Sequence, residues 1–319
     1  MSRAEVAITG VGAVGAFGVG LEALAACLGG GHPLQTQRYE VRGGALTVGQ
    51  VSFKLRDHWP GVSRKLGRMD RGSRMFLLAG REALQGAGLA GADLSGTGVA
   101  LGSRFGCLLV NEAYHRGLLT KGVRLASPLL FGYTVPSAPA GELSIAFGLT
   151  GPNLTVVSGD ASGGGALARA AAWIRAGRAR RVVAGGCDPQ GPWLAQELWD
   201  RGIRDGRGPL PAEGAAALVL EPADEVRRRG VRPLATLGPI TEGFGPAGDV
   251  ADPLADRIGR TYAASAPLAL AARLAGGTGA EGATSERIEV RDGQGYRVAI
   301  EWTPGPPTRS GSDDGRATA

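Results

Sequence analysis

The stretch Gly151–Leu167 reads GPNLTVVSGDASGGGAL and combines a strand pattern with a helix pattern. Its apolar run, Leu154–Val157, is typical of a buried strand. The residues after Gly159 are small, which is typical of a helix that packs closely against its neighbours. A strand that turns sharply into such a helix displays one side chain, here Asp160, where backbone N–H groups and the helix dipole favour a thiolate or an oxyanion. We therefore expect a strand-to-helix elbow at Asp160.

Short strands and helices alternate on both sides of this elbow, which indicates the α/β class. The expected strands are Val6–Thr9, Val99–Leu101, Leu154–Val157, Arg181–Ala184 and Ala215–Glu221. The expected helices are Leu21–Leu28, Arg71–Ala87, Val110–Leu119, Ala140–Phe147, Gly164–Ala176, Ala223–Arg229 and Leu268–Ala275. Near the C-terminal end, Ile288–Val290 and Tyr296–Trp302 alternate apolar and polar residues around Asp292-Gly293, which predicts a β-hairpin.

The composition of the 319-residue chain fits a folded protein with a large core. Apolar residues make up 43% and charged residues 20%, which excludes wholesale disorder. The 55 glycines follow no triplet period, which excludes a collagen-like structure. Three scattered cysteines are too few for a disulfide framework or a zinc site, so we expect no metal. We find no signal peptide and no apolar run long enough to span a bilayer, and we expect a cytoplasmic protein without membrane contact.

The formal net charge of +6 comes almost entirely from arginine. Two arginine clusters each follow an expected helix: Arg175, Arg178, Arg180 and Arg181, and Arg227, Arg228, Arg229 and Arg232. One interpretation is favourable charge at helix C-termini. The other is a docking surface for an acidic protein. No nucleic-acid-binding motif accompanies the clusters, so we expect no nucleic-acid partner.

The glycines Gly10, Gly12 and Gly15 form a G-x-G-x-x-G pattern after an expected strand. One interpretation is a dinucleotide-binding loop, which would make the protein an NAD(P)-dependent dehydrogenase. That interpretation requires a second apolar strand about 20 residues further on, but Gly29–Gln37 is glycine-rich and polar. The other interpretation is a tight turn between a buried strand and a helix.

Several motifs, taken in order, resemble the ketosynthase family of the thiolase fold. The elbow is followed by VVAGGCD at Val182–Asp188, and the chain begins with VAITGVGAVG at Val6–Gly15. Matching pieces also include Met69–Arg71, the helix before Gly148–Pro152, and EGAAALVLE at Glu213–Glu221. The resemblance runs from about residue 4 to residue 240. It implies a thiolase-like αβαβα layered α/β fold with a shortened second half. We expect one domain over residues 1–303, divided at about residue 180, and a disordered tail over residues 304–319.

The chain departs from a catalytic ketosynthase at the residues that carry the chemistry. Asp160 occupies the position of the nucleophilic cysteine, and a carboxylate is a poor substitute for a thiolate in attacking a thioester. The family also needs two histidines in its second half, but no histidine follows His115. Cys107 and Cys187 are interpreted as small buried hydrophobic residues. Asp160 is either the N-cap of the helix or an ionised group that faces a substrate.

The piece Gly259–Leu274, GRTYAASAPLALAARL, resembles the chain length factor of type II polyketide synthases. That family usually has glutamine at the nucleophile position, from which Asp160 departs. The resemblance implies a non-catalytic subunit that forms a heterodimer with a catalytic ketosynthase, receives chains from an acyl carrier protein, and uses no cofactor. It also implies dimerisation through the elbow strand and helix at about Leu154–Ala176. We expect no catalytic residue and no autonomous activity, and a degenerate ketosynthase with a purely structural role remains an alternative.

In chain length factors, a helix shortly after a strand and a glycine turn gates the elongation tunnel at the subunit interface. The corresponding helix here is expected around residues 110–119, after the turn at Gly106. Val110, Ala113, Tyr114 and Gly117 share one face of that helix by their spacing. One interpretation of this face is ordinary core. The other is tunnel lining, because Ala113 and Gly117 are small and glycine inside a helix costs about 1 kcal/mol relative to alanine.

Overall fold

The computed structural model describes residues 4–63, 66, 69–246, 250–275 and 284–305. The strands are β1 (Val6–Gly15), β2 (Gly18–Val19), β3 (Thr36–Val41), β4 (Gly44–Gly49), β5 (Gly98–Gly102), β6 (Asn153–Val156), β7 (Val182–Asp188), β8 (Gly214–Pro222), β9 (Ala235–Phe244), β10 (Glu286–Arg291) and β11 (Tyr296–Pro304). The α-helices are α1 (Leu21–Leu28), α2 (Leu55–His58), α3 (Arg71–Gly86), α4 (Leu108–Lys121), α5 (Pro128–Phe131), α6 (Ala138–Phe147), α7 (Ser162–Arg175), α8 (Pro192–Asp200), α9 (Ala223–Arg228), α10 (Ala255–Ile258) and α11 (Ser265–Ala275). Two short 3₁₀ helices are η2 (Val123–Leu125) and η3 (Tyr262–Ala264).

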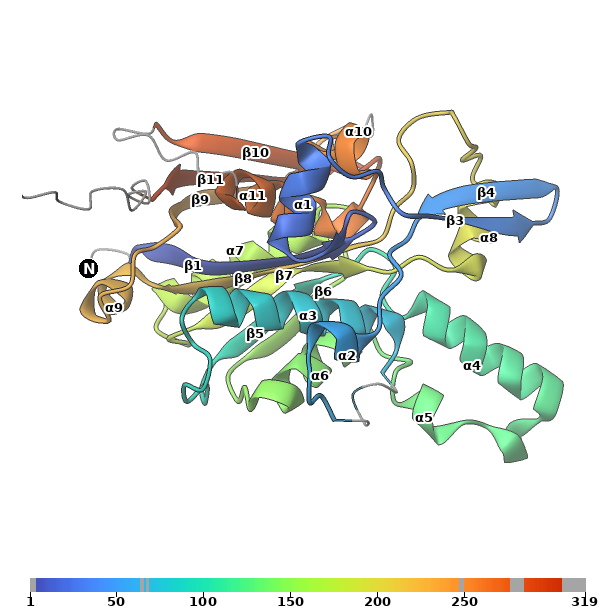
Figure 1. Cartoon of the computed structure of the whole chain (residues 1–319), viewed down its shortest axis with the longest axis horizontal. Coiled ribbons are helices and arrows are strands. Elements are labelled where there is room, and N and C mark those ends of the chain that lie inside the picture. The colour runs from blue at the N-terminus through green and yellow to red at the C-terminus, as the bar shows by residue number, and fades with distance from the viewer. Residues whose placement is uncertain (1–3, 64–65, 67–68, 247–249, 276–283, 306–319) are drawn as a thin grey trace, which may run out of the picture.

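One large sheet joins both halves of the chain in the order β10-β11-β9-β1-β8-β7-β5-β6. The pairs β5–β6 and β5–β7 are parallel, whereas β1 pairs antiparallel with both β8 and β9. Figure 1 shows α3 below β1 and β8, α1 and α11 above them, and β10 at the upper edge of the view, while β9 lies beside β1. The layered α/β fold expected from the sequence is therefore confirmed. Strands from both halves share one sheet, which supports the proposal of a single domain over residues 1–303.

The glycine pattern near the N-terminus lies inside a strand and not in a loop. Strand β1 continues to Gly15, and all of its residues are buried. A Cβ atom at Gly10 would lie 1.9 Å from the carbonyl oxygen of Ala83, and one at Gly12 would lie 2.1 Å from that of Ala79. The glycines therefore allow the backbone of α3 to pack directly on β1. The dinucleotide-loop interpretation is wrong, and so is the tight-turn interpretation.

Most expected elements are present with small changes at their ends. The helix α1 has the predicted bounds, α3 ends one residue earlier, and the C-terminal hairpin β10–β11 forms an antiparallel pair. Strand β9, helix α8 and the separate two-stranded sheet β3–β4 were not predicted from the sequence. That hairpin has exposed polar residues along β3, so its pattern resembles a loop. The tail expected from residue 304 lies, from residue 306 onward, outside the described residues.

The segment from α4 to α5 extends away from the layered body, as Figure 1 shows at its lower right. Helix α4 has no buried residue. Large apolar side chains on this segment are exposed, including Leu119, Val123, Leu125, Leu129 and Phe131. We call residues 108–135 the arm. Within the described part of the chain, no helix is long and apolar enough to cross a membrane.

Candidate functional site

The elbow forms where the sequence predicts it, between the end of β6 and the start of α7. The helix N-cap is Ala161, and no side chain caps it. The turn is held instead by Ser162, whose hydroxyl donates to the carbonyl of Gly159 (2.6 Å) and accepts from the backbone N–H of Ser158 (2.8 Å). The N-cap interpretation of Asp160 is therefore wrong.

The carboxylate of Asp160 is held between two arginines from distant parts of the chain. Its side chain is only 2% exposed. One oxygen pairs with Arg104, in the turn after β5, and the other lies 2.6 Å from a guanidinium nitrogen of Arg260, just before η3. Because both carboxylate oxygens are engaged, Asp160 does not face a substrate as a free anion, and that interpretation is not supported. We call Arg104, Asp160 and Arg260 the clamp.

Aromatic side chains cover the two arginines of the clamp. Tyr262 is 2% exposed, and its ring lies 5.7 Å from the guanidinium carbon of Arg104 and 5.2 Å from that of Arg260. Phe105 packs edge-on against Tyr262 at 4.8 Å between ring centroids. Tyr262 has a φ of 53°, the one non-glycine residue with a positive φ in the described ranges. Such a conformation costs about 1 kcal/mol or more, so the surrounding packing must hold it in place.

A fully buried carboxylate, Asp188, fixes the two loops that carry the clamp arginines. It accepts hydrogen bonds from the backbone N–H groups of Arg104 and Phe105 and from the hydroxyl of Ser103, on one side. On the other side it accepts from the backbone N–H of Ala263 at 3.0 Å. Burial raises the pKa of Asp188 from 3.8 to about 6, although these hydrogen bonds oppose the rise. Asp188 therefore ties the turn after β5 to η3.

The chemistry that this arrangement permits is limited. A carboxylate saturated by two guanidinium groups is a weak base and a weak nucleophile. Burial is the largest single influence on the pKa of Arg260 and lowers it, but the charge and hydrogen bond of Asp160, together with the nearby Tyr262 and Asp252, raise it by more, and the net pKa is raised. Arg260 therefore stays charged at physiological pH. The elbow therefore holds a buried ion-pair cluster.

The two cysteines near the site are not activated. Cys187 is buried, as expected, and burial raises its pKa well above the ordinary value for a thiol. Cys107 is only half-buried, but burial also raises its pKa, and its thiol donates to the carbonyl of Thr134 (3.1 Å). A raised pKa leaves both sulfurs protonated, so neither is suited to nucleophilic attack.

The four residues expected to line a tunnel lie on α4 but do not enclose one. Val110 lines an internal cavity, whereas Ala113 is exposed and a Cβ on Gly117 would meet no atom within 4 Å. The ring of Tyr114 lies 5.8 Å from that of Phe131 on α5. The core interpretation of this face is wrong, because no residue of α4 is buried. Within one chain the face is open.

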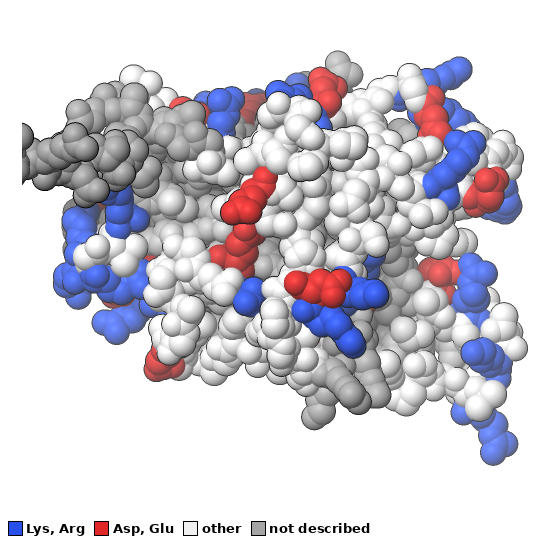
Figure 2. Space-filling view, viewed as in Figure 1, with Lys and Arg blue, Asp and Glu red and all other residues white. Residues whose placement is uncertain are grey.

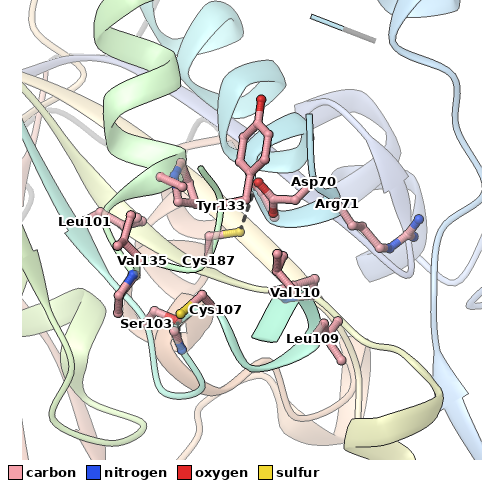
Figure 3. A pocket seen from close by; sticks show the side chains of 16 residues that line it. Asp70, Arg71, Leu101, Ser103, Cys107, Leu109, Val110, Tyr133, Val135 and Cys187 are labelled. Carbon is pink, nitrogen blue, oxygen red and sulfur yellow. Dashed lines mark hydrogen bonds between the residues drawn. The ribbon is translucent and has the colours of Figure 1, made fainter. Parts of the chain in front are cut away.

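Below the first turn of α4 lies a narrow cavity of about 40 Å³. Figure 3 shows Val110, Leu109 and Leu101 around it, with the sulfurs of Cys107 and Cys187 facing the same space. Its floor is formed by buried residues of β5 and β7, and its rim includes the exposed Val135. The cavity therefore runs from the arm toward the centre of the sheet. We call it the arm cavity.

The two arginine clusters meet at one corner of the molecule. The carboxylate of Glu221, 1% exposed, pairs with Arg181 (3.0 Å) and Arg229 (2.7 Å). Arg180 pairs with Glu225, and Arg228 pairs with Asp224. Figure 2 shows these basic side chains around α9. Strand β7 separates this corner from the elbow, because the clusters lie at its start and Asp188 lies at its end. Neither cluster adjoins the clamp.

The fold and the elbow define a class: a layered α/β protein in which a strand-to-helix elbow carries a carboxylate held in an arginine clamp. Residues 3–225 match the family model described as the beta-ketoacyl synthase N-terminal domain. The chain therefore belongs to the beta-ketoacyl synthase family of the thiolase-like superfamily.

Curated relatives share the family over part of their length. Nodulation protein E of Rhizobium sp. (strain N33) is 32% identical over 260 residues, which cover 74% of this chain and 62% of that protein. 3-Oxoacyl-[acyl-carrier-protein] synthase 2 of Vibrio harveyi is 34% identical over 211 residues, 59% of this chain and 49% of that protein. The chain thus spans 62% and 49% of the lengths of these two relatives.

Solved structures show the same fold at low sequence identity. A type II polyketide synthase ketosynthase, in complex with its acyl-carrier protein and bound to the hexaketide, has a TM-score of 0.77 at 19% identity, covering 95% of this chain and 99% of that chain. The ishigamide ketosynthase/chain length factor has a TM-score of 0.75 at 22% identity, covering 94% of this chain and 99% of that chain. These likenesses establish the ketosynthase fold.

Sequence reasoning missed the roles of Arg104, Arg260, Tyr262 and Asp188. Arg260 and Tyr262 lie in the piece Gly259–Leu274 that the sequence analysis singled out. One feature of the sequence could have indicated such partners: a buried charge is paired in folded proteins, so an aspartate predicted at a buried elbow requires cationic side chains nearby. The order of the chain did not reveal which of its many arginines would supply them.

Proposed function

We propose that this protein is a chain length factor: a non-catalytic subunit that pairs with a catalytic ketosynthase and shapes the tunnel for the growing polyketide chain. The clamp is the observation that carries this proposal. A ketosynthase elbow presents a nucleophile, but here the corresponding carboxylate of Asp160 is buried and neutralised by Arg104 and Arg260. The elbow therefore serves to complete the fold, and the chemistry belongs to a partner.

The surface next to the elbow supports a partner of the same fold. Strand β6 is the edge of the large sheet, and Val157, which follows it, is 50% exposed. Ile145 on α6 is another large apolar side chain at the surface and is 77% exposed. An unpaired strand edge beside a large apolar surface indicates a protein interface. A ketosynthase subunit that pairs along β6 would cover both and would close the open face of α4.

Two features of related structures agree with this assignment. One solved structure with this fold is a ketosynthase/chain length factor, and another is a ketosynthase with its acyl-carrier protein. We infer that a carrier protein delivers the chain to the partner's active site, while this subunit contributes the arm to the tunnel wall. The residues Val110, Ala113, Tyr114 and Gly117 form the part of the arm that we assign to the tunnel.

Co-expression with a catalytic ketosynthase tests the proposal. We expect a one-to-one complex that extends chains from malonyl- and acyl-loaded carrier proteins, whereas the isolated chain makes no ketide. Asp160→Cys should leave the isolated chain inactive, because its second half has no histidine to assist decarboxylation. Replacing the ketosynthase's nucleophilic cysteine by alanine should abolish the activity of the complex. Ketide formation by the isolated chain, or the absence of any complex, would contradict the proposal.

A further inference from the structure

The hydroxyl and thiol groups that line the arm cavity donate their hydrogens within the protein. The hydroxyl of Tyr133 donates to Glu142 (2.7 Å), and that of Ser103 donates to Asp188 (2.7 Å). The thiol of Cys107 donates to the carbonyl of Thr134 (3.1 Å), and that of Cys187 points to the carbonyl of Gly72 (3.5 Å).

The two charged residues beside the cavity also face their own partners. Arg71 pairs through its guanidinium with Glu213 and the carbonyl of Val51, and Figure 3 shows its charged end pointing away from the cavity. The carboxylate of Asp70 accepts from the backbone N–H and the hydroxyl of Ser73. A carboxylate accepts hydrogen bonds and therefore offers nothing to a ketone oxygen.

The remaining wall of the cavity is apolar. Leu101 and Cys187 form a floor that is closed to solvent, Leu109 and Val110 form one wall, and Val135 stands at the rim with 47% of its surface exposed. The volume of about 40 Å³ suits about three water-sized groups. The cavity therefore fits the narrow end of an unbranched chain.

These features separate two kinds of chain. A poly-β-ketone carries an oxygen acceptor on every second carbon, and each acceptor buried without a donor weakens binding by roughly tenfold or more. A hydrocarbon or polyene end carries none. Resting on the proposed function, we propose that the arm cavity receives the end of a reduced, hydrocarbon-like chain, alkyl or polyene, and rejects a polyketone.

Titration calorimetry with two acids of equal length tests this assignment on the full-length chain. The probes are decanoic acid and 2-[2-(2-methoxyethoxy)ethoxy]acetic acid, which has ten chain atoms and three ether acceptors. We expect decanoic acid to bind at least tenfold more tightly. Val135→Trp fills the exposed rim and should weaken decanoic acid by at least tenfold, whereas the matched change Leu129→Trp, on the arm but outside the cavity lining, should leave it within threefold.

Val110→Thr tests whether the preference depends on the lack of a hydrogen-bond donor in the cavity or only on the hydrophobicity of the probe. The substitution keeps the side-chain shape and adds one hydroxyl donor. We expect it to reduce the preference for decanoic acid by at least threefold. A wild-type preference under tenfold, decanoic acid binding that survives Val135→Trp, or an unchanged preference in Val110→Thr would each overturn the assignment. Co-purification with a ketosynthase, scored on the same preparations, tests the proposed function separately: an intact complex with no preference rejects only the hydrocarbon assignment.

Discussion

Asp160→Asn tests whether the clamp stabilises the fold. The substitution keeps the shape of the side chain but removes the charge that neutralises Arg104 and Arg260, and it turns an amide N–H₂ toward one of them. Removing one partner of a fully buried ion pair costs about 3–5 kcal/mol. Solvent reaches about a quarter of each arginine side chain here, so screening reduces the expected loss to about 2–3 kcal/mol.

Urea unfolding followed by two probes measures this loss. With an m-value of about 3 kcal/mol/M for a chain of this size, the midpoint should fall by about 0.7–1 M. Asp224→Asn is the matched control, because Asp224 pairs with Arg228 on the surface with 59% of its side chain exposed. We expect that control to leave the urea midpoint unchanged, because an exposed ion pair contributes little to stability.

A double-mutant cycle shows whether the loss comes from the clamp itself. Adding Arg260→Gln to Asp160→Asn should cost at least about 1 kcal/mol less than the sum of the two single losses, because each single variant leaves the other charge without its partner. A loss below about 0.5 kcal/mol in Asp160→Asn, or strict additivity in the cycle, would refute the view that the clamp is a buried, mutually stabilising cluster.

Substitutions at three further positions test other parts of the structure. Gly10→Ala places a Cβ 1.9 Å from the carbonyl oxygen of Ala83 and should lower the unfolding free energy by about 3 kcal/mol or more. The control Gly117→Ala adds a Cβ in open space and should raise the unfolding free energy by about 0.5–1 kcal/mol. Equal effects of the two substitutions would contradict the packing of α3 on β1. Gly117→Phe should leave the heterodimer intact and shorten its product, and products of unchanged length by mass spectrometry would remove Gly117 from the tunnel. Burial raises the pKa of Asp188 to about 6, so the native state binds the Asp188 proton more tightly than the unfolded state does. The stability contribution of Asp188 should therefore fall by about 1 kcal/mol between pH 5 and pH 7. An equal pH dependence of stability in Asp188→Asn would show that another group is responsible.

The sequence predicted elements whose periodicity and local signals agree with their final environment. The elbow at Asp160, the amphipathic helix α3 and the hairpin β10–β11 all combine a local pattern with matching burial. It failed where tertiary packing overrides local preference. The glycines of β1 suggest a loop, but they are required inside a strand by the close approach of α3.

The candidate site was predictable in position but not in composition. The motif around Asp160 located the elbow, whereas its partners come from residues 56 and 100 positions away. Periodicity also grouped Val110 and Gly117 on one face of α4 correctly. It could not say what covers that face, and the core interpretation failed because α4 extends from the body and buries no residue.

The clamp also has a consequence for the order of folding. Arg104, Asp160 and Arg260 belong to the turn after β5, the elbow and the loop before η3, so their ion pairs close long chain loops. Contacts of such large sequence separation form late, after the loop-closure entropy has been overcome by other packing. Until Arg260 packs against the elbow, Asp160 lacks one of its two counter-charges. Burying the Asp160 carboxylate at that stage would carry a large desolvation penalty. A nascent chain that has emerged only through α7 therefore carries an open, hydrated elbow, and completion of the second half closes it.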